Sequence, residues 1–143
     1  MSVPPKPWLG IGLRARAALR AEPRACALRL CVTAGLRLIP IEHPHETRLG
    51  RDVAIDLSLQ PRDARGGVAI ALASMLIERE NLALDLDQLN QALADVALEL
   101  ILPADELERV WAEQDGNVEA VDRVYSAHVP SSWVLRLAET LEL

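Results

Sequence analysis

Two of the three histidines, His43 and His45, are the residues whose type and spacing most directly suggest chemistry. Together with Glu46 they form a His-x-His-Glu cluster in a segment that also contains Pro44. Imidazole and carboxylate groups are zinc ligands, so the cluster could hold a metal ion if another segment supplied a further ligand. A solvated loop is the simpler interpretation of the same residues. A metalloenzyme with an atypical site at His43 and His45 is therefore kept as one alternative.

Other catalytic patterns are missing from the sequence. It contains no GxSxG, P-loop or GxGxxG motif, and its serines lack a neighbouring base along the chain. Cys26 and Cys31 match no zinc or redox spacing and are interpreted as buried thiols. His128 is expected at a helix end or in the core. A nucleophile that the fold assembles from distant segments stays open, but the sequence itself predicts no catalytic residue, no metal ligand set and no cofactor.

The composition favours a single domain that can build its own core. The chain has 143 residues, half of them apolar, and at this length needs neither disulfides nor a structural metal. Its net charge is −6, with basic groups concentrated before residue 66 and acidic groups after it. Nucleic-acid binders need a concentrated basic face, so the acidic total argues against that class. No apolar stretch approaches the roughly 20 residues that cross a bilayer, and residues 1–7 lack signal-peptide features, which predicts a cytoplasmic protein without a membrane partner.

The elements that must position any site begin after an arm. Residues 1–12 are rich in proline and glycine and are interpreted as an N-terminal arm anchored by Trp8, which leaves residues 13–143 as the domain. A short strand is expected at 36–41. In residues 51–59 apolar side chains alternate strictly with small or polar ones. This period of two predicts a half-buried strand of the antiparallel type.

Helices are predicted on both sides of these strands. Residues 68–77 are apolar on every side, as expected of a central buried helix. Residues 85–102 carry apolar side chains at helical spacing, with Asp85 as the N-cap. Further helices are expected at 13–20, 23–35, 103–113, 118–125 and 131–141. The elements predict an α+β fold in which a small, mostly antiparallel sheet packs on a buried central helix and is covered by C-terminal helices.

Three phrases of the sequence, in this order, carry a resemblance. Val68–Ala71 stand where one helix of typical sequence FTLAHELGHHLL has FTLA, Ala92–Pro103 look like a helix ending FAAELLMP, and Gly116–Leu143 resemble two closing helices. All three belong to the HExxH metallopeptidase-like family that includes phage antirepressor proteases. The resemblance covers about residues 24–143 and implies a zincin-like fold.

The departures from this family fall on the residues that bind its metal. Two histidines at i and i+4 hold the zinc in an HExxH helix, and the glutamate polarises the bound water. The resemblance places Leu72, Ala73 and Leu76 at these positions, and none of them can bind zinc. It therefore implies a pseudo-metalloprotease that keeps the fold and has lost hydrolysis.

Peptide binding is the property that such a scaffold would retain. In zinc peptidases of this kind the substrate lies along the strand before the active-site helix, which here is 51–59. A free strand edge offers backbone groups for β-augmentation. Arginines near this strand in the sequence, at positions 48, 51, 62 and 65, suggest an acidic peptide. The predicted peptide-binding residues are Arg51, Asp52, Val53, Ala54, Ile55, Asp56 and Leu57.

A narrower resemblance suggests the biological setting. The chain is similar in size and character to small, ligand-less relatives that bind peptides in the biosynthesis of ribosomally made, modified peptides such as crocagin. This implies a precursor or leader peptide and biosynthetic enzymes as partners, with the chain assisting catalysis by those enzymes. A homodimer is also expected, because small apolar chains often hide surface by self-association. The other alternative is a regulatory interaction module of the antirepressor or toxin-antitoxin type that grips its partner with residues 85–102 and 103–113.

Overall fold

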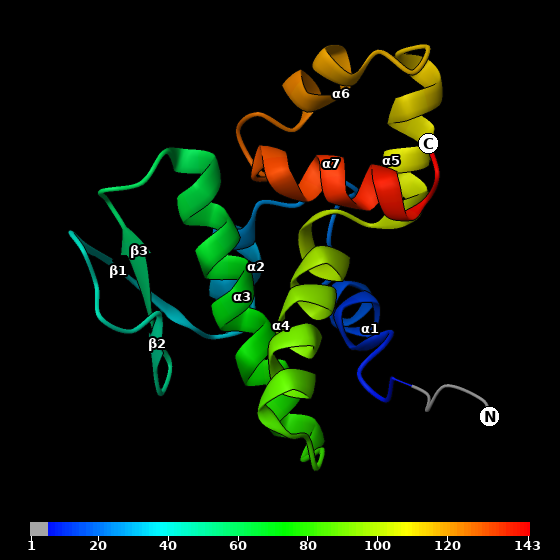
Figure 1. Ribbon diagram of the computed structural model, residues 1–143. Helices are drawn as coiled ribbons and strands as arrows, with labels where there is room; N and C mark the ends of the chain where they lie inside the picture. Colours follow the sequence, from blue (N-terminus) through cyan, green and yellow to red (C-terminus); the bar gives the residue numbers. More distant parts are fainter. Residues whose placement is uncertain (1–5) are drawn as a thin grey trace.

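The computed structural model describes residues 6–143 (Figure 1). Residues 1–5 of the predicted arm lie outside this part, and the arm's predicted end at residue 12 falls inside the first helix. The helices are α1 (Ile11–Ala18), α2 (Ala27–Thr33), α3 (Pro61–Glu80), α4 (Leu86–Ile101), α5 (Ala104–Glu113), α6 (Val118–Val124) and α7 (Ser131–Thr140). The strands are β1 (Arg37–Ile41), β2 (Arg48–Leu49) and β3 (Asp52–Asp56). The fold of the described residues is therefore a mixed α+β fold, as predicted.

Helix α3 is the centre of the molecule, which confirms the central buried helix. Its core residues include Val68, Ala69, Leu72 and Ala73, none of which is exposed at all. Pro61 occupies the first turn, where its missing N–H costs no hydrogen bond, and the helix ends at Asn81 in the left-handed conformation. None of the helices in residues 6–143, α3 included, combines the length and hydrophobicity that crossing a bilayer requires.

Helix α4 runs beside α3 and starts at the predicted cap (Figure 1). The Asp85 carboxylate accepts the Gln88 backbone N–H at 2.8 Å, and the Gln88 side chain accepts the Asp85 N–H at 3.0 Å, which completes a capping box. On its other side α4 packs against α1 and the segment before it. The indole of Trp8 is buried there and donates to Asp95 at 2.8 Å, so the predicted anchoring role of Trp8 is confirmed.

The sheet differs from the predicted one in the direction of its strands. The strand order is β1-β3-β2, and β1 pairs with β3 in parallel along all five residues. Only the two residues of β2 pair with β3 in the antiparallel direction. The expectation of a mostly antiparallel sheet is therefore wrong, because β1 and β3 are not hairpin neighbours: the chain passes through β2, on the far side of β3, between them. The sheet is mixed.

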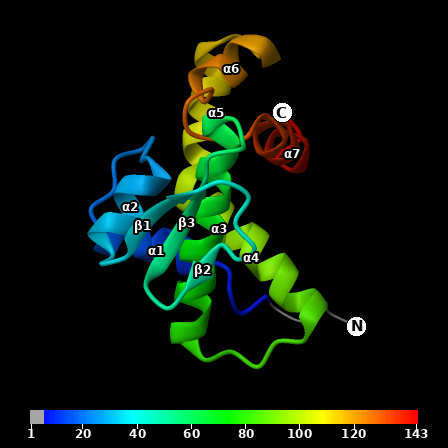
Figure 2. The same cartoon turned by 90° about the vertical axis from the view of Figure 1, so that its left-hand side faces the viewer.

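One face of this sheet packs on α3 (Figure 2). Val53 is fully buried, and Leu38 and Ile55 pack against the same core. The strand predicted at 51–59 ends earlier, at Asp56, and Leu57 is 58% exposed in the turn that leads to α3. A sheet on a central helix is thus confirmed, while the zincin-like arrangement stays a prediction.

Helices α5, α6 and α7 pack on one another at one end of the molecule (Figure 1). Trp111 in α5 and Trp133 in α7 are partly buried against the core, as expected for this cover. Arg62 near the start of α3 ties the cover to the central helix. Its guanidinium donates to the Val129 carbonyl at 2.7 Å and forms a two-point pair with Asp122 at 2.7 and 3.1 Å.

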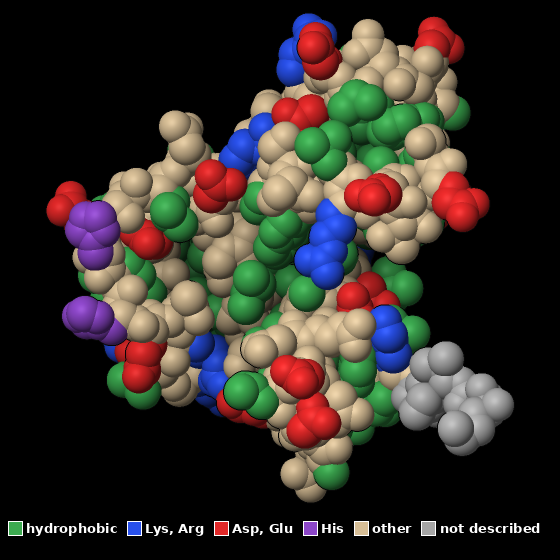
Figure 3. All heavy atoms as spheres, in the orientation of Figure 1, with side chains coloured by type: hydrophobic (Ala, Val, Ile, Leu, Met, Phe, Trp, Pro, Cys, Tyr) green, Lys and Arg blue, Asp and Glu red, His purple; other side chains and the backbone are tan. Residues whose placement is uncertain are grey.

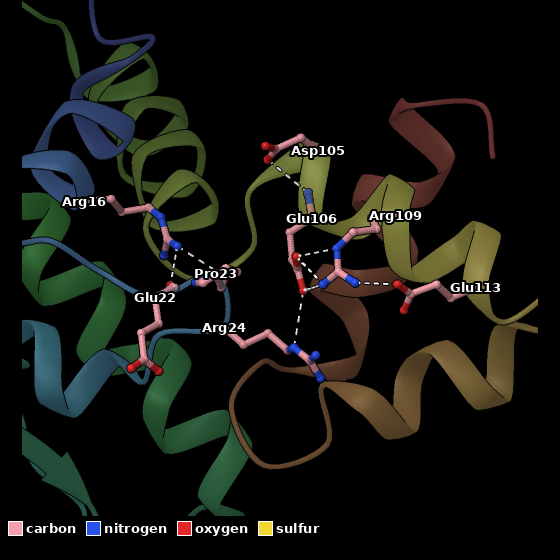
Figure 4. A network of polar contacts seen from close by, with 8 residues as sticks. All are labelled: Arg16, Glu22, Pro23, Arg24, Asp105, Glu106, Arg109 and Glu113. Carbon is pink, nitrogen blue, oxygen red and sulfur yellow. Dashed lines mark hydrogen bonds and ion pairs between the residues drawn. The ribbon is translucent and has the colours of Figure 1, made fainter.

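A second polar connection joins the cover to the N-terminal segment (Figure 4). Glu106 in α5 is buried, and its carboxylate lies between Arg109 of the same helix at 2.7 Å and Arg24 at 3.3 Å. Close by, the buried Arg16 donates to the carbonyls of Leu100 at 2.5 Å and Glu22 at 2.6 Å. The segment between α1 and α2 is thus held to the α4–α5 junction by charge-assisted hydrogen bonds.

Candidate functional site

The candidate site is the solvent face of the sheet, opposite α3. Strand side chains alternate between the two faces, so the register of β1 and β3 decides which residues meet on each. Ile39 lies beside Ala54 and Ile41 beside Asp56, with the pair of Arg37 and Asp52 next to them. This face has an apolar centre and a charged pair at one end.

A loop turns this face into a hollow. Because β2 lies on the far side of β3 from β1, the chain after Ile41 must cross β3 to reach Arg48. This loop forms one side of a hollow of about 500 Å³ on the outer face of the sheet. That volume is within the range of small-ligand pockets. The hollow is lined by Ile39, Ile41, Glu42, His43, Pro44, His45, Glu46, Arg48, Leu49, Asp52 and Ala54.

Two ionised carboxylates, Asp52 and Asp56, belong to the outer face, and both already accept hydrogen bonds from neighbouring side chains. The Arg37 guanidinium donates to both oxygens of Asp52 at 2.9 Å, which lowers the pKa of Asp52 and raises that of Arg37. The hydroxyl and backbone N–H of Ser58 donate to Asp56 at 2.5 and 2.9 Å, and the hydroxyl contributes most to the lowered pKa of Asp56. Neither carboxylate is poised as a general base near neutral pH, because both stay ionised and hydrogen-bonded.

Arg48 borders the hollow, but its side chain lies on the other face of the sheet, because it is paired directly across from the inward-facing Val53 and reaches Glu78 of α3. Its side chain is only 14% exposed, donates to the Gly50 carbonyl at 2.8 Å and pairs with Glu78 of α3. Its Nε is buried and has no hydrogen-bond partner among residues 6–143. This donor belongs to the α3 side of the sheet and is not offered to a ligand in the hollow.

The predicted peptide-binding edge is not free. Strand β3 lies between two others: Leu57 N–H donates to the Ile41 carbonyl at 3.0 Å on one side, and Ala54 N–H donates to the Thr47 carbonyl at 3.0 Å on the other. The edge along β1 is blunted, because Pro40 there has no N–H to offer. Backbone pairing at Arg51, Asp52, Val53, Ala54, Ile55, Asp56 and Leu57 is therefore the wrong mode, although Asp52 and Ala54 do line the hollow.

The arginines expected to attract an acidic peptide do not converge on the strand either. Arg48 and Arg62 are engaged by Glu78 and Asp122. Arg65 lies against Cys26 and lines a small pocket at the end of β3 with Ile55 and Leu57. Arg51 stands exposed beside the Gly50 turn. The preference for an acidic ligand stays a prediction, and long-range ion pairs leave only Arg51 and Arg65 of the set to support it.

The positions that correspond to the family's zinc ligands belong to the core. Leu72 and Ala73 are fully buried in α3, and Leu76 is half-buried against the same cluster. His43 and His45 are exposed on the loop; Figure 3 shows histidine side chains at the surface on the sheet side of the molecule. Among residues 6–143, no three His, Cys, Asp or Glu side chains form a group that could hold a metal ion.

Several residues of the hollow were missed as a site. Ile39, Ile41 and Leu49 are apolar residues of short strands, and the pattern of 36–41 predicted a strand without showing what lies over either of its faces. The signal that was present is the loop from Glu42 to Glu46, whose two histidines were considered only as metal ligands. No protein-family model, curated protein or solved structure matches the chain.

Proposed function

We propose that the protein is a non-catalytic peptide-binding protein and that the hollow over Ile39, Ile41 and Ala54 receives an apolar side chain of the peptide. The observation that carries this proposal is an apolar-floored hollow of about 500 Å³ on an otherwise exposed sheet face, walled by a loop with polar side chains. Burying an apolar side chain there contributes about 1.5–3 kcal/mol.

The polar side chains of the loop beside the hollow suggest which residues flank the apolar side chain in the peptide. Glu42 and Glu46 are exposed and have no arginine or lysine partner within the described residues. Basic residues beside the apolar anchor would complement them.

The biological setting in this proposal comes from the resemblance of the sequence to metallopeptidase-like proteins that lack zinc ligands. In this proposal the peptide is a precursor of a ribosomally made, modified peptide, and the chain presents it to modifying enzymes without a cofactor of its own. Burial of Leu72 and Ala73 in the core supports a scaffold role for α3 rather than a zinc-binding one. Self-association into a homodimer stays a prediction, which sedimentation equilibrium would test.

Calorimetric titration tests the proposal with chelator-treated protein and precursor peptides encoded beside its gene. We expect micromolar or tighter binding without metal. Ala54→Tyr fills the hollow from its floor, keeps a residue that strands favour, and is expected to weaken binding at least about tenfold. Leu135→Tyr, at an exposed position of α7, is the matched control and should leave the affinity unchanged.

The outcomes separate the site from the function. Binding that Ala54→Tyr does not weaken would place the peptide elsewhere on the molecule. Affinity or hydrolysis that appears only after zinc is restored would contradict the non-catalytic proposal and favour a metalloenzyme.

A further inference from the structure

A second pocket, away from the sheet face, concentrates positive charge. It has a volume of about 320 Å³ and is formed by the segment from Leu19 to Thr33, closed by His128 from the turn between α6 and α7. Three arginines line it, Arg20, Arg24 and Arg29, together with Cys26 and one carboxylate, Glu22. In a chain of net charge −6, such a cluster stands out.

Most of this charge is not neutralised within the protein. Arg20 and Arg29 form no ion pair in residues 6–143. Arg24 faces Glu106 at 3.3 Å, but that carboxylate is shared with Arg109 at 2.7 Å. A fourth arginine, Arg65 of α3, lies against Cys26 and likewise has no acidic partner in the described chain.

One buried polar atom of the pocket lining also lacks a partner. Nδ1 of His128 has no hydrogen bond within residues 6–143. Nε of Arg65 is likewise unpartnered, but Arg65 lines a neighbouring pocket beside Ile55. Buried polar atoms of native proteins are nearly always paired, with protein, water or ligand. Burial lowers the pKa of His128, and Arg65 and Arg24 lower it further. The imidazole is thus neutral at pH 7 and offers one N–H and one lone pair.

We infer that this pocket binds a small oxyanion, the phosphate or carboxylate group of a ligand, through Arg20, Arg24 and Arg29. Guanidinium forks match the geometry of these groups and form short, charge-assisted hydrogen bonds with them. The inference does not depend on the proposed peptide site, because the two pockets share no residue.

Cys26 provides a built-in reporter for the pocket. Its thiol is half-buried in the pocket wall. Partial burial raises its pKa, but the Arg65 guanidinium and the backbone N–H groups of Leu28 and Arg29 outweigh that effect, so the pKa is lowered. Cys31 is fully buried, and its burial raises the pKa to about 12, which makes it an unreactive internal control.

The experiment compares alkylation of Cys26 by iodoacetate and by neutral iodoacetamide in the full chain. In both reactions the thiolate sulfur forms a bond to the CH2 carbon and iodide leaves. Peptide fragmentation by mass spectrometry locates the label. Relative to the protein unfolded in urea, we expect the iodoacetate-to-iodoacetamide rate ratio to rise about tenfold, because the pocket concentrates the anionic reagent.

Competing salts and one matched pair of variants complete the test. Inorganic phosphate or acetate should slow the iodoacetate reaction more than chloride at equal ionic strength, and the stronger of the two identifies the preferred oxyanion. Arg29→Gln should lower the rate ratio at least about threefold, whereas Arg136→Gln, another exposed arginine without an ion pair, should not change it. A folded-state ratio equal to that of the unfolded chain, or equal effects of all three salts, would overturn the inference.

Discussion

At the scale of single residues, Glu106 shows how a carboxylate is tolerated in this core. It is 6% exposed, yet it accepts from Arg109 of its own helix and faces Arg24 from the segment before α2 (Figure 4). Arg109 also pairs with Glu113 at 2.5 Å on the surface. The buried carboxylate serves as a bridge between two parts of the chain, whereas Glu113 is an ordinary helix-surface partner.

Removing the bridge should therefore cost more than removing the surface partner. We expect Glu106→Ala to lower the free energy of unfolding by about 2 kcal/mol, less than for a fully buried pair because both arginines are half-exposed and water repays part of the loss. Glu113→Ala should cost no more than about 0.5 kcal/mol. Urea denaturation of both variants measures the difference, and equal losses would show that Glu106 is not the bridge.

At the scale of elements, α3 contains two adjacent glycines with opposite surroundings. A Cβ on Gly66 would lie 2.6 Å from Cγ of Pro130, at the contact with the loop before α7. A Cβ on Gly67 would meet nothing within 4 Å. Gly66 is thus required by the close approach of the C-terminal cover, and Gly67 is only a weak point in the helix.

The pair makes a matched experiment on one helix. Gly67→Ala should raise the free energy of unfolding by about 1 kcal/mol, because alanine is the better helix former. Gly66→Ala has the same helical gain but forces a rigid proline ring aside, and we expect a net loss of about 1–3 kcal/mol. Thermal and urea unfolding test both, and stabilisation by Gly66→Ala would mean that Pro130 yields easily.

At the scale of the whole molecule, the pair of Arg62 and Asp122 fastens the C-terminal helices to the central one. Arg62 contributes most to the lowered pKa of Asp122, whose ordinary value is 3.8. Just below pH 3.8, Asp122 is largely protonated in the unfolded chain, whereas in the folded protein it is still ionised. The stabilisation by this pair is therefore fully present above about pH 4–5 and is lost as the pH falls through the lowered pKa.

The acid dependence of stability tests this attachment. We expect Asp122→Asn to lower the free energy of unfolding at pH 7 by about 1–2 kcal/mol, and the difference from the unaltered protein to shrink steadily below about pH 4. Asp87→Asn, at an exposed position of α4 outside any ion pair of the described residues, is the surface control and should lower the free energy of unfolding less than Asp122→Asn at pH 7. A constant gap between Asp122→Asn and the unaltered protein down to pH 2 would contradict the assignment.

The sequence by itself determined the helices, because their apolar periodicity and end signals are local. The all-round apolar run of 68–77 and the Asp85 cap predicted α3 and α4 correctly, and the alternation from Val53 predicted β3 and its inward face. Strand β2, with two residues, is too short to show a period, so neither the central place of β3 nor its parallel pairing could be predicted.

Only the tertiary structure decided the site. The hollow exists because the loop after Ile41 must cross β3, and the partners of Arg62 and Arg24 lie 60 or more residues away along the chain. Strand order and ion pairs join segments distant in sequence, and local side-chain patterns carry no information about which distant segment is the partner. The same reason explains why an edge expected to be open is filled, while a loop noted only for its histidines walls the largest hollow described above.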